Sequence, residues 1–120
     1  PQANRPQGYT EHRKFRRVQT ALPVEVSFDG KNPFMSEIQT LSVKGCFVAL
    51  LEGERAKLPA VNSTGALRIY YYQDQVLDIA KCRIANHKNN GGSAGVGIEF
   101  LEFDSRARKL LEAIVKSHSY

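Results

Sequence analysis

Alternating apolar and polar positions predict several half-buried β-strands in the first part of the chain. The stretches 21–28 and 67–72 both have the two-residue period of a strand with one buried face. Pro23 indicates a strand start or a sheet edge, because proline lacks the N–H that a central strand donates. Weaker alternation at 34–41 and a short apolar run at 46–51 predict two more strands between them.

The later part of the chain continues this pattern. The segment 76–86 alternates but changes phase near Ala80, which predicts a β-bulge. Residues 87–93 are rich in Asn and Gly and are expected to form a flexible hairpin tip. A sixth strand is predicted at 96–100, where alternating glycines are typical of tight curvature or close backbone approach.

The last segment is the one with a helical period. Asp104 or Ser105 is the expected N-cap, whereas 52–64 is expected to be irregular. Apolar residues at helical spacing form a stripe of Ala107, Leu110, Leu111, Ile114 and Val115. Six strands followed by one helix predict an all-β fold, a small antiparallel barrel with a helix that plugs or flanks it.

Length and charge bound the organisation and the partners. The chain has 120 residues, which favours one domain; residues 1–10 are expected to be disordered and 11–120 to fold. A net charge of +5 favours an anionic partner. No apolar run is long enough to span a bilayer, and the polar first residues do not have the pattern of a signal peptide. Because the chain begins with Pro1, we expect it to be a piece of a longer protein.

The chemistry-bearing residues give little support for catalysis or metal binding. Cys46 and Cys82 lie in apolar stretches, so we expect two buried, reduced thiols and a cytosolic protein. The three histidines lack partners at metal-ligand spacing. Ser42 lies outside any Gly-x-Ser-x-Gly elbow, and no phosphate-binding Gly-rich loop occurs. We therefore expect neither an enzyme nor a metal site.

A basic cluster precedes the first strand. Arg13, Lys14, Arg16 and Arg17 place four positive charges in five positions, with Phe15 among them. A guanidinium is planar and always charged, and its donors form a fixed fork. Arg13 and Arg17 would thus hold one planar, anionic ligand together. A solvated basic tail is the plainer alternative.

A second candidate segment, 40–45, lies between the second and third predicted strands. The hydroxyl of Ser42 and the backbone of Gly45 would both face a ligand without a bulky Cβ in the way. Taken alone, a Ser-x-x-Gly sequence is more typical of a plain β-turn. The segment gains weight only in combination with the arginines.

The order and separation of the two motifs resemble the PilZ domain family. Its members carry Arg-x-x-x-Arg before the first strand and Asp/Asn-x-Ser-x-x-Gly after the second. Arg13 and Arg17 complete the first motif here. Ser42 and Gly45 match the second, with Thr40 at the Asp/Asn position.

The strand at 22–26 and the glycine-rich segment 95–100 before the terminal helix are similar to the family too, so the resemblance covers about residues 11–117. It implies a six-stranded antiparallel Greek-key barrel with a C-terminal helix. It also implies a bacterial receptor for cyclic di-GMP (c-di-GMP) that acts on motility, adhesion or exopolysaccharide output through a protein partner or an attached domain.

The residues fit this ligand independently, because guanine O6 and N7 accept an arginine fork and the two phosphates need cations. The resemblance implies that Arg13 and Arg17 hold the guanine edges and phosphates, and that Ser42 and Gly45 line the barrel face beneath them. The expected ligand-binding residues are Arg13, Lys14, Arg17, Thr40, Ser42 and Gly45. No cofactor is expected.

Two departures from the family pattern and two competing functions accompany this reading. Thr40 lacks the carboxylate or amide of the family motif, which implies weakened binding, and His12 stands where many members have a further arginine. Thr40 also motivates a second hypothesis, an interaction adaptor that does not bind the nucleotide. A third hypothesis is a basic barrel that binds RNA or single-stranded DNA. It ranks below the others because the positive charges cluster at one end, so no nucleic-acid polymer is expected as a partner. Membrane insertion is not expected either.

Overall fold

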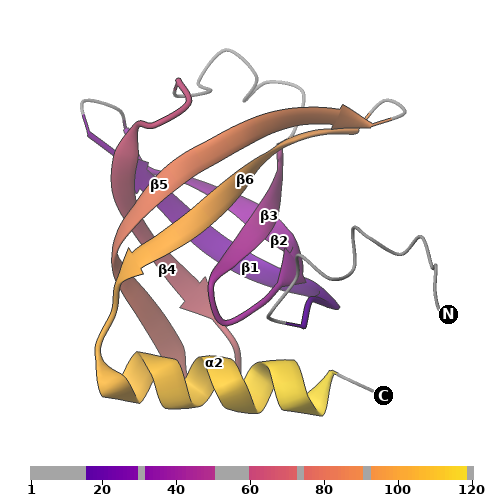
Figure 1. The fold of residues 1–120 in the computed structure, drawn as a ribbon, viewed down its shortest axis with the longest axis vertical. Coiled ribbons are helices and arrows are strands. Elements are labelled where there is room, and N and C mark those ends of the chain that lie inside the picture. Colours follow the sequence, from indigo (N-terminus) through magenta and orange to yellow (C-terminus); the bar gives the residue numbers. More distant parts are fainter. Residues whose placement is uncertain (1–15, 30–31, 51–59, 73–74, 91–92, 119–120) are drawn as a thin grey trace, which may run out of the picture.

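A computed structural model describes residues 16–29, 32–50, 60–72, 75–90 and 93–118 of the chain. Within them the chain forms a β-barrel and a helix (Figure 1). The elements are β1 (Val18–Phe28), β2 (Phe34–Leu41), β3 (Gly45–Leu50), β4 (Thr64–Tyr70), β5 (Val76–Asn90), β6 (Ser93–Glu102) and α2 (Ser105–Ser117). Residues 1–10, predicted to be disordered, lie outside the described residues.

The strands close into a barrel in the order β1-β2-β3-β6-β5-β4, and β1 completes the ring by pairing with β4. Every neighbouring pair is antiparallel. β4 follows β3 in the sequence but pairs with β1, and the neighbour of β3 is β6. Closure leaves no open sheet edge in the ring. The predicted six-stranded antiparallel barrel with a C-terminal helix is confirmed.

Several strand ends differ from the sequence prediction. β1 starts at Val18 because its first residues pair with the end of β2, whereas β4 ends at Tyr70, before the predicted boundary at Tyr72. The hairpin tip predicted at 87–93 is wrong over 87–90, since β5 continues to Asn90 and pairs with β6 as far as Ser93. Backbone pairing with a long neighbouring strand overrides the turn preference of Asn and Gly.

The predicted bulge in β5 is confirmed. In the pairing with β4 the register shifts between Gly65 and Leu67, where two residues of β5, Ala80 and Lys81, lie opposite Ala66 alone. Leu77 and Ile79 are buried before the shift, and Cys82 and Ile84 are buried after it. The extra residue keeps apolar side chains inward on both sides of the irregularity. In the pairing of β5 with β6 the register shifts between Ile84 and Asn86, at the candidate site.

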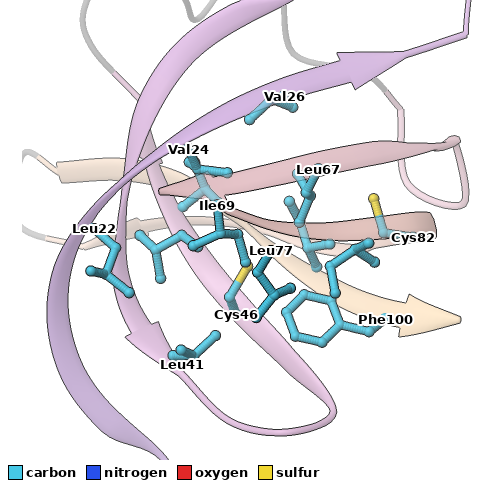
Figure 2. Packing of buried hydrophobic residues seen from close by; sticks show 14 of the residues in the cluster. Leu22, Val24, Val26, Leu41, Cys46, Leu67, Ile69, Leu77, Cys82 and Phe100 are labelled. Carbon is cyan, nitrogen blue, oxygen red and sulfur yellow. The ribbon is translucent and has the colours of Figure 1, made fainter. Parts of the chain in front are cut away.

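The interior of the barrel is filled by inward-facing side chains of all six strands (Figure 2). Buried side chains of α2 join the same cluster. The largest fully buried side chains are Ile38, Leu41, Ile69, Leu77, Ile79, Ile84, Leu111, Ile114, Val24, Val26, Val48 and Cys82. Burying one such aliphatic side chain contributes about 1.5–3 kcal/mol. Cys46 and Cys82 are both free and buried, as predicted.

The helix α2 lies across one end of the barrel (Figure 1). Asp104 is its N-cap, and the side-chain carboxylate accepts a hydrogen bond from the backbone N–H of Ala107 at 2.8 Å. Ala107, Leu111 and Ile114 are buried against the core, so the predicted apolar stripe is confirmed. No helix in the described part of the chain combines the length and apolar character that a membrane crossing requires.

Candidate functional site

The turn between β2 and β3 is held by a serine side chain. The Oγ of Ser42 accepts hydrogen bonds from the backbone N–H groups of Lys44 at 3.1 Å and Gly45 at 3.2 Å. The backbone N–H of Ser42 also donates to the carbonyl of Gly45 at 2.9 Å. Ser42 is only 7% exposed. Its hydroxyl therefore fixes the shape of the turn, and part of its hydrogen-bonding capacity is already used.

Gly45 brings β3 close to β6. A Cβ at this position would lie 2.3 Å from the carbonyl oxygen of Ile98, which belongs to the backbone and cannot move aside on its own. Only glycine permits this approach. The turn therefore sits directly against β6, with the side chain of Ser42 beneath it.

A hollow of about 180 Å³ lies beside this turn. Its walls come from the residue before β1, from the β2–β3 turn and from the facing parts of β5 and β6. The lining residues are Arg17, Thr40, Leu41, Ser42, Lys44, Gly45, Cys46, Phe47, Ala85, Asn86, Gly97 and Ile98. The hollow thus brings together segments that are far apart in the sequence.

The hollow includes four of the six residues predicted to bind the ligand. Arg17 is exposed at its edge, and Thr40, Ser42 and Gly45 line it. Thr40 reaches the site because it pairs across the sheet with Gln19 of β1, two residues after Arg17. Arg13 and Lys14 are outside the described residues. Their contribution to the site stays a prediction.

Other cations near the site differ in what they contact. Lys44 is exposed and lines the hollow. Arg83 of β5 is not among the lining residues: its Nε donates to the carboxylate of Glu99 at 3.0 Å, and its Nη1 donates to Oδ1 of Asn62 at 2.6 Å. Arg83 therefore ties β5 to β6 and to the residues before β4, and its guanidinium is already paired.

Six lining residues lie outside the two predicted motif segments, 13–17 and 40–45: Cys46, Phe47, Ala85, Asn86, Gly97 and Ile98. They come mostly from β5 and β6, and the shift between Ile84 and Asn86 decides which of them face the hollow. That register cannot be read from the sequence. The alternating glycines of β6 were the available signal, because they indicated close approach at this strand.

The hollow has positively charged side chains at its edge and uncharged side chains at its floor. Arg17 and Lys44 supply the positive charges. Cys46 lies at the floor, and burial, aided by the nearby Cys82, raises the pKa of its thiol far above the usual range, so this thiol stays neutral. In the described part of the chain, no group of three or more His, Cys, Asp or Glu side chains is placed to hold a metal ion. The positive edge suits an anionic ligand.

A closed six-stranded barrel, a helix across one end and a basic-edged hollow at the β2–β3 turn define the class of this domain, a small closed β-barrel with a C-terminal helix. The sequence profile of the PilZ domain matches residues 11–117. The chain belongs to the PilZ domain family. No curated protein matches the chain by sequence.

Solved structures share the fold at low sequence identity. The PilZ domain of YcgR from Escherichia coli, solved with c-di-GMP, has a TM-score of 0.73 and 13% identity, and the match covers 90% of this chain and 92% of that one. The inhibitor of motility MotI/DgrA from Bacillus subtilis has a TM-score of 0.74 and 15% identity, over 90% of this chain and 51% of that one.

The PilZ domain of CeSA from a cellulose-synthesizing bacterium has a TM-score of 0.60 and 21% identity, over 88% of this chain and 99% of that one. Isolated PilZ domains are therefore covered almost fully, whereas the chain spans about half the length of MotI. At these identities the likeness is one of fold.

Proposed function

We propose that this PilZ domain is a receptor for c-di-GMP and that the ligand binds in the hollow beside the β2–β3 turn. The observation that carries the proposal is that Arg17, from the first family motif, lines the same hollow as Thr40, Ser42 and Gly45 of the second. The two motifs are separated in the sequence by the whole of β1 and most of β2. The pairing of β1 with β2 places the residue before β1 beside the end of β2, so the fold brings residues of both motifs to one hollow.

The ligand chemistry matches the hollow. c-di-GMP carries two phosphates and two guanines, so it needs cations for the former and a donor fork for the O6 and N7 edge of the latter. The guanidinium of Arg17 meets both needs. The exposed face of the glycine-containing turn leaves room for a flat base, and Arg13 and Lys14 are proposed to close over it.

Isothermal titration calorimetry with c-di-GMP tests the proposal. We expect the wild type to bind and Arg17→Ala to lose about tenfold or more in affinity, since a bidentate guanine contact is worth about 1–3 kcal/mol. The double variant Arg13→Ala/Arg17→Ala should lose at least tens of fold. Arg106→Ala, which removes the same charge from the exposed first turn of α2, is the matched control and should bind like the wild type.

Absence of heat for the wild type at high micromolar c-di-GMP would overturn the receptor. Equal losses in Arg17→Ala and Arg106→Ala would show that only net charge matters. The same titration with single-stranded oligonucleotides at two salt concentrations covers the polymer alternative, which requires a steep salt dependence.

Thr40 favours one second candidate, an adaptor that has lost the nucleotide. Threonine offers one hydroxyl where the family motif has a carboxylate or an amide. Thr40→Asp separates the two functions. A large gain in affinity for c-di-GMP identifies a weakened receptor, whereas no binding by either form identifies an adaptor.

As a receptor, the domain would act as a regulatory module and not as an enzyme. Ligand binding would order the segment around Arg13 and Arg17 against the barrel, and this surface would signal to a protein partner or an attached domain. Motility, adhesion and exopolysaccharide production are the proposed outputs, in the cytosol. Pull-down from a bacterial lysate with and without c-di-GMP tests this step, and a partner retained only with the ligand is the expected result.

A further inference from the structure

Asn86 lies on β5 immediately after a register shift. Ile84 pairs with Ile98 of β6, and Asn86 pairs with Gly97, so Ala85 is the extra residue on β5. Such a bulge changes the direction of the side chain that follows it. Ala85, Asn86 and Gly97 all line the hollow.

The carboxamide of Asn86 rests over Gly97. A Cβ at position 97 would lie 2.7 Å from Oδ1 of Asn86 and 3.1 Å from both Cγ and Nδ2. The whole terminal group therefore occupies the space next to the glycine, and any larger residue at position 97 would push it away. Asn86 is nevertheless solvent-exposed, so its amide is open to a ligand in the hollow.

The polar side chains around the hollow differ in what they can offer a base. The side chains of Arg17 and Lys44 are donors only, and the Ser42 hydroxyl already serves the turn. Thr40 has a single hydroxyl. Among the described residues that line the hollow, Asn86 alone presents an acceptor and donors side by side in one plane.

We propose that Asn86 is a purine-reading residue of this site and supplies the planar acceptor-and-donor group that Thr40 does not. The inference rests on the proposed function, because it assigns a role toward the same ligand. Guanine presents N1–H and N2–H₂ donors beside the O6 acceptor, and a carboxamide complements a donor and its neighbouring acceptor. Arg17 cannot accept a hydrogen bond from the N1–H or N2–H₂ group of guanine. Without an acceptor in the hollow, these groups would lose their hydrogen bonds to water when the ligand binds.

A carboxamide also has a consequence for selectivity. Because it both donates and accepts, it complements an adenine edge as well as a guanine edge. A carboxylate in its place accepts only, and therefore favours the N1–H and N2–H₂ pair of guanine. Asn86→Asp should raise the preference for c-di-GMP over cyclic di-AMP. The added negative charge cancels in this ratio, since both ligands carry the same two phosphates.

Calorimetry with both dinucleotides on four variants tests the inference. Asn86→Ala should weaken c-di-GMP binding by about tenfold. Gly97→Ala should produce a similar loss, because its methyl group displaces the amide. The double variant Asn86→Ala/Gly97→Ala should lose little more than either single variant. Asn86→Asp should raise the ratio of the two affinities several-fold, and thermal melting should show all four variants folded.

Asn32→Ala, which removes an exposed carboxamide away from the residues lining the hollow, is the control. A wild type that binds c-di-GMP together with an Asn86→Ala variant that binds within twofold overturns the role of Asn86 and leaves the receptor intact. Additive losses in the double variant, or an unchanged ratio in Asn86→Asp, also overturn it. A wild type that binds neither dinucleotide overturns both proposals.

Discussion

The end of the barrel beneath α2 and the hollow beside the β2–β3 turn are built from the same sheet but present different chemistry. At the helix, Leu111 and Ile114 are fully buried. The rings of Phe100 and Phe103 meet edge to face with centroids 6.1 Å apart, and the guanidinium of Arg108 lies 5.1 Å from the centre of the Phe103 ring. Apolar packing closes this end.

At the hollow, hydrogen bonds to backbone amides and close approach at glycines take the place of side-chain packing. Ser42 fixes the turn through its hydroxyl, Gly45 allows β3 to approach β6, and Gly97 makes room for the amide of Asn86. Arg17 and Asn86 stay exposed. The difference indicates that the two regions have separate roles. The helix-covered end contributes to the stability of the fold, and the hollow exposes polar groups to a ligand without disturbing the packing of the core.

The largest expected effect comes from the helix-covered end. Leu111→Ala should lower the free energy of unfolding by about 2–5 kcal/mol, because it leaves a cavity among fully buried side chains. Affinity of the folded protein for c-di-GMP should stay the same. Urea unfolding and calorimetry measure the two quantities. Glu112→Ala, at the neighbouring exposed position, is the control; a selective loss of affinity in Leu111→Ala would break the proposed separation.

Gly45→Ala tests the contact between β3 and β6 at the hollow and should have the next largest effect on stability. The new methyl group would lie 2.3 Å from the backbone oxygen of Ile98, so β3 and β6 must separate. We expect a loss of about 1–3 kcal/mol in stability, as for overpacking of a core, together with weaker ligand binding. Urea unfolding measures the stability loss.

The matched comparison for Gly45→Ala is Gly97→Ala. There the methyl group meets the end of the Asn86 side chain, which can rotate away. Gly97→Ala should therefore cost much less stability while still reducing affinity. Equal stability losses in the two variants would contradict the view that the glycines serve different purposes.

The fold was largely predictable because its strands carry a clear apolar period. Burial at Leu22, Val24, Val26 and Phe28 follows the alternation in the sequence, and the phase change in β5 coincides with a real bulge. Strand ends were less predictable. The extension of β5 to Asn90 depends on pairing with β6, and that is a tertiary property which local Asn and Gly content opposes.

The site was predictable only where a motif marks it. Arg17, Ser42 and Gly45 lie in segments with a recognisable spacing, and the hollow includes them. Asn86 has no such marker, because its position depends on which residue of β5 is the extra one in the bulge. The sequence also hides that the Ser42 hydroxyl is bound to backbone amides, since this follows from the geometry of the turn.

The smallest expected effect is the pH dependence of stability that comes from the two thiols. It tests whether water enters the barrel through the hollow. Burial raises the pKa of Cys82 to about 12 and raises that of Cys46 further, although Cys46 lines the hollow. Thiols of the unfolded chain ionise near pH 9, so above that pH the unfolded state binds fewer protons than the folded state. The free energy of unfolding should therefore fall as pH rises, with a slope that steepens through pH 9 and a loss of about 1.4 kcal/mol for each thiol between pH 8 and pH 10. Urea unfolding between pH 8 and pH 10 measures this slope, and Cys46→Ala should remove the share of one thiol. A slope that Cys46→Ala leaves unchanged would mean that the Cys46 thiol already ionises in the folded protein, and that the floor of the hollow is wet and unlike the closed end beneath α2.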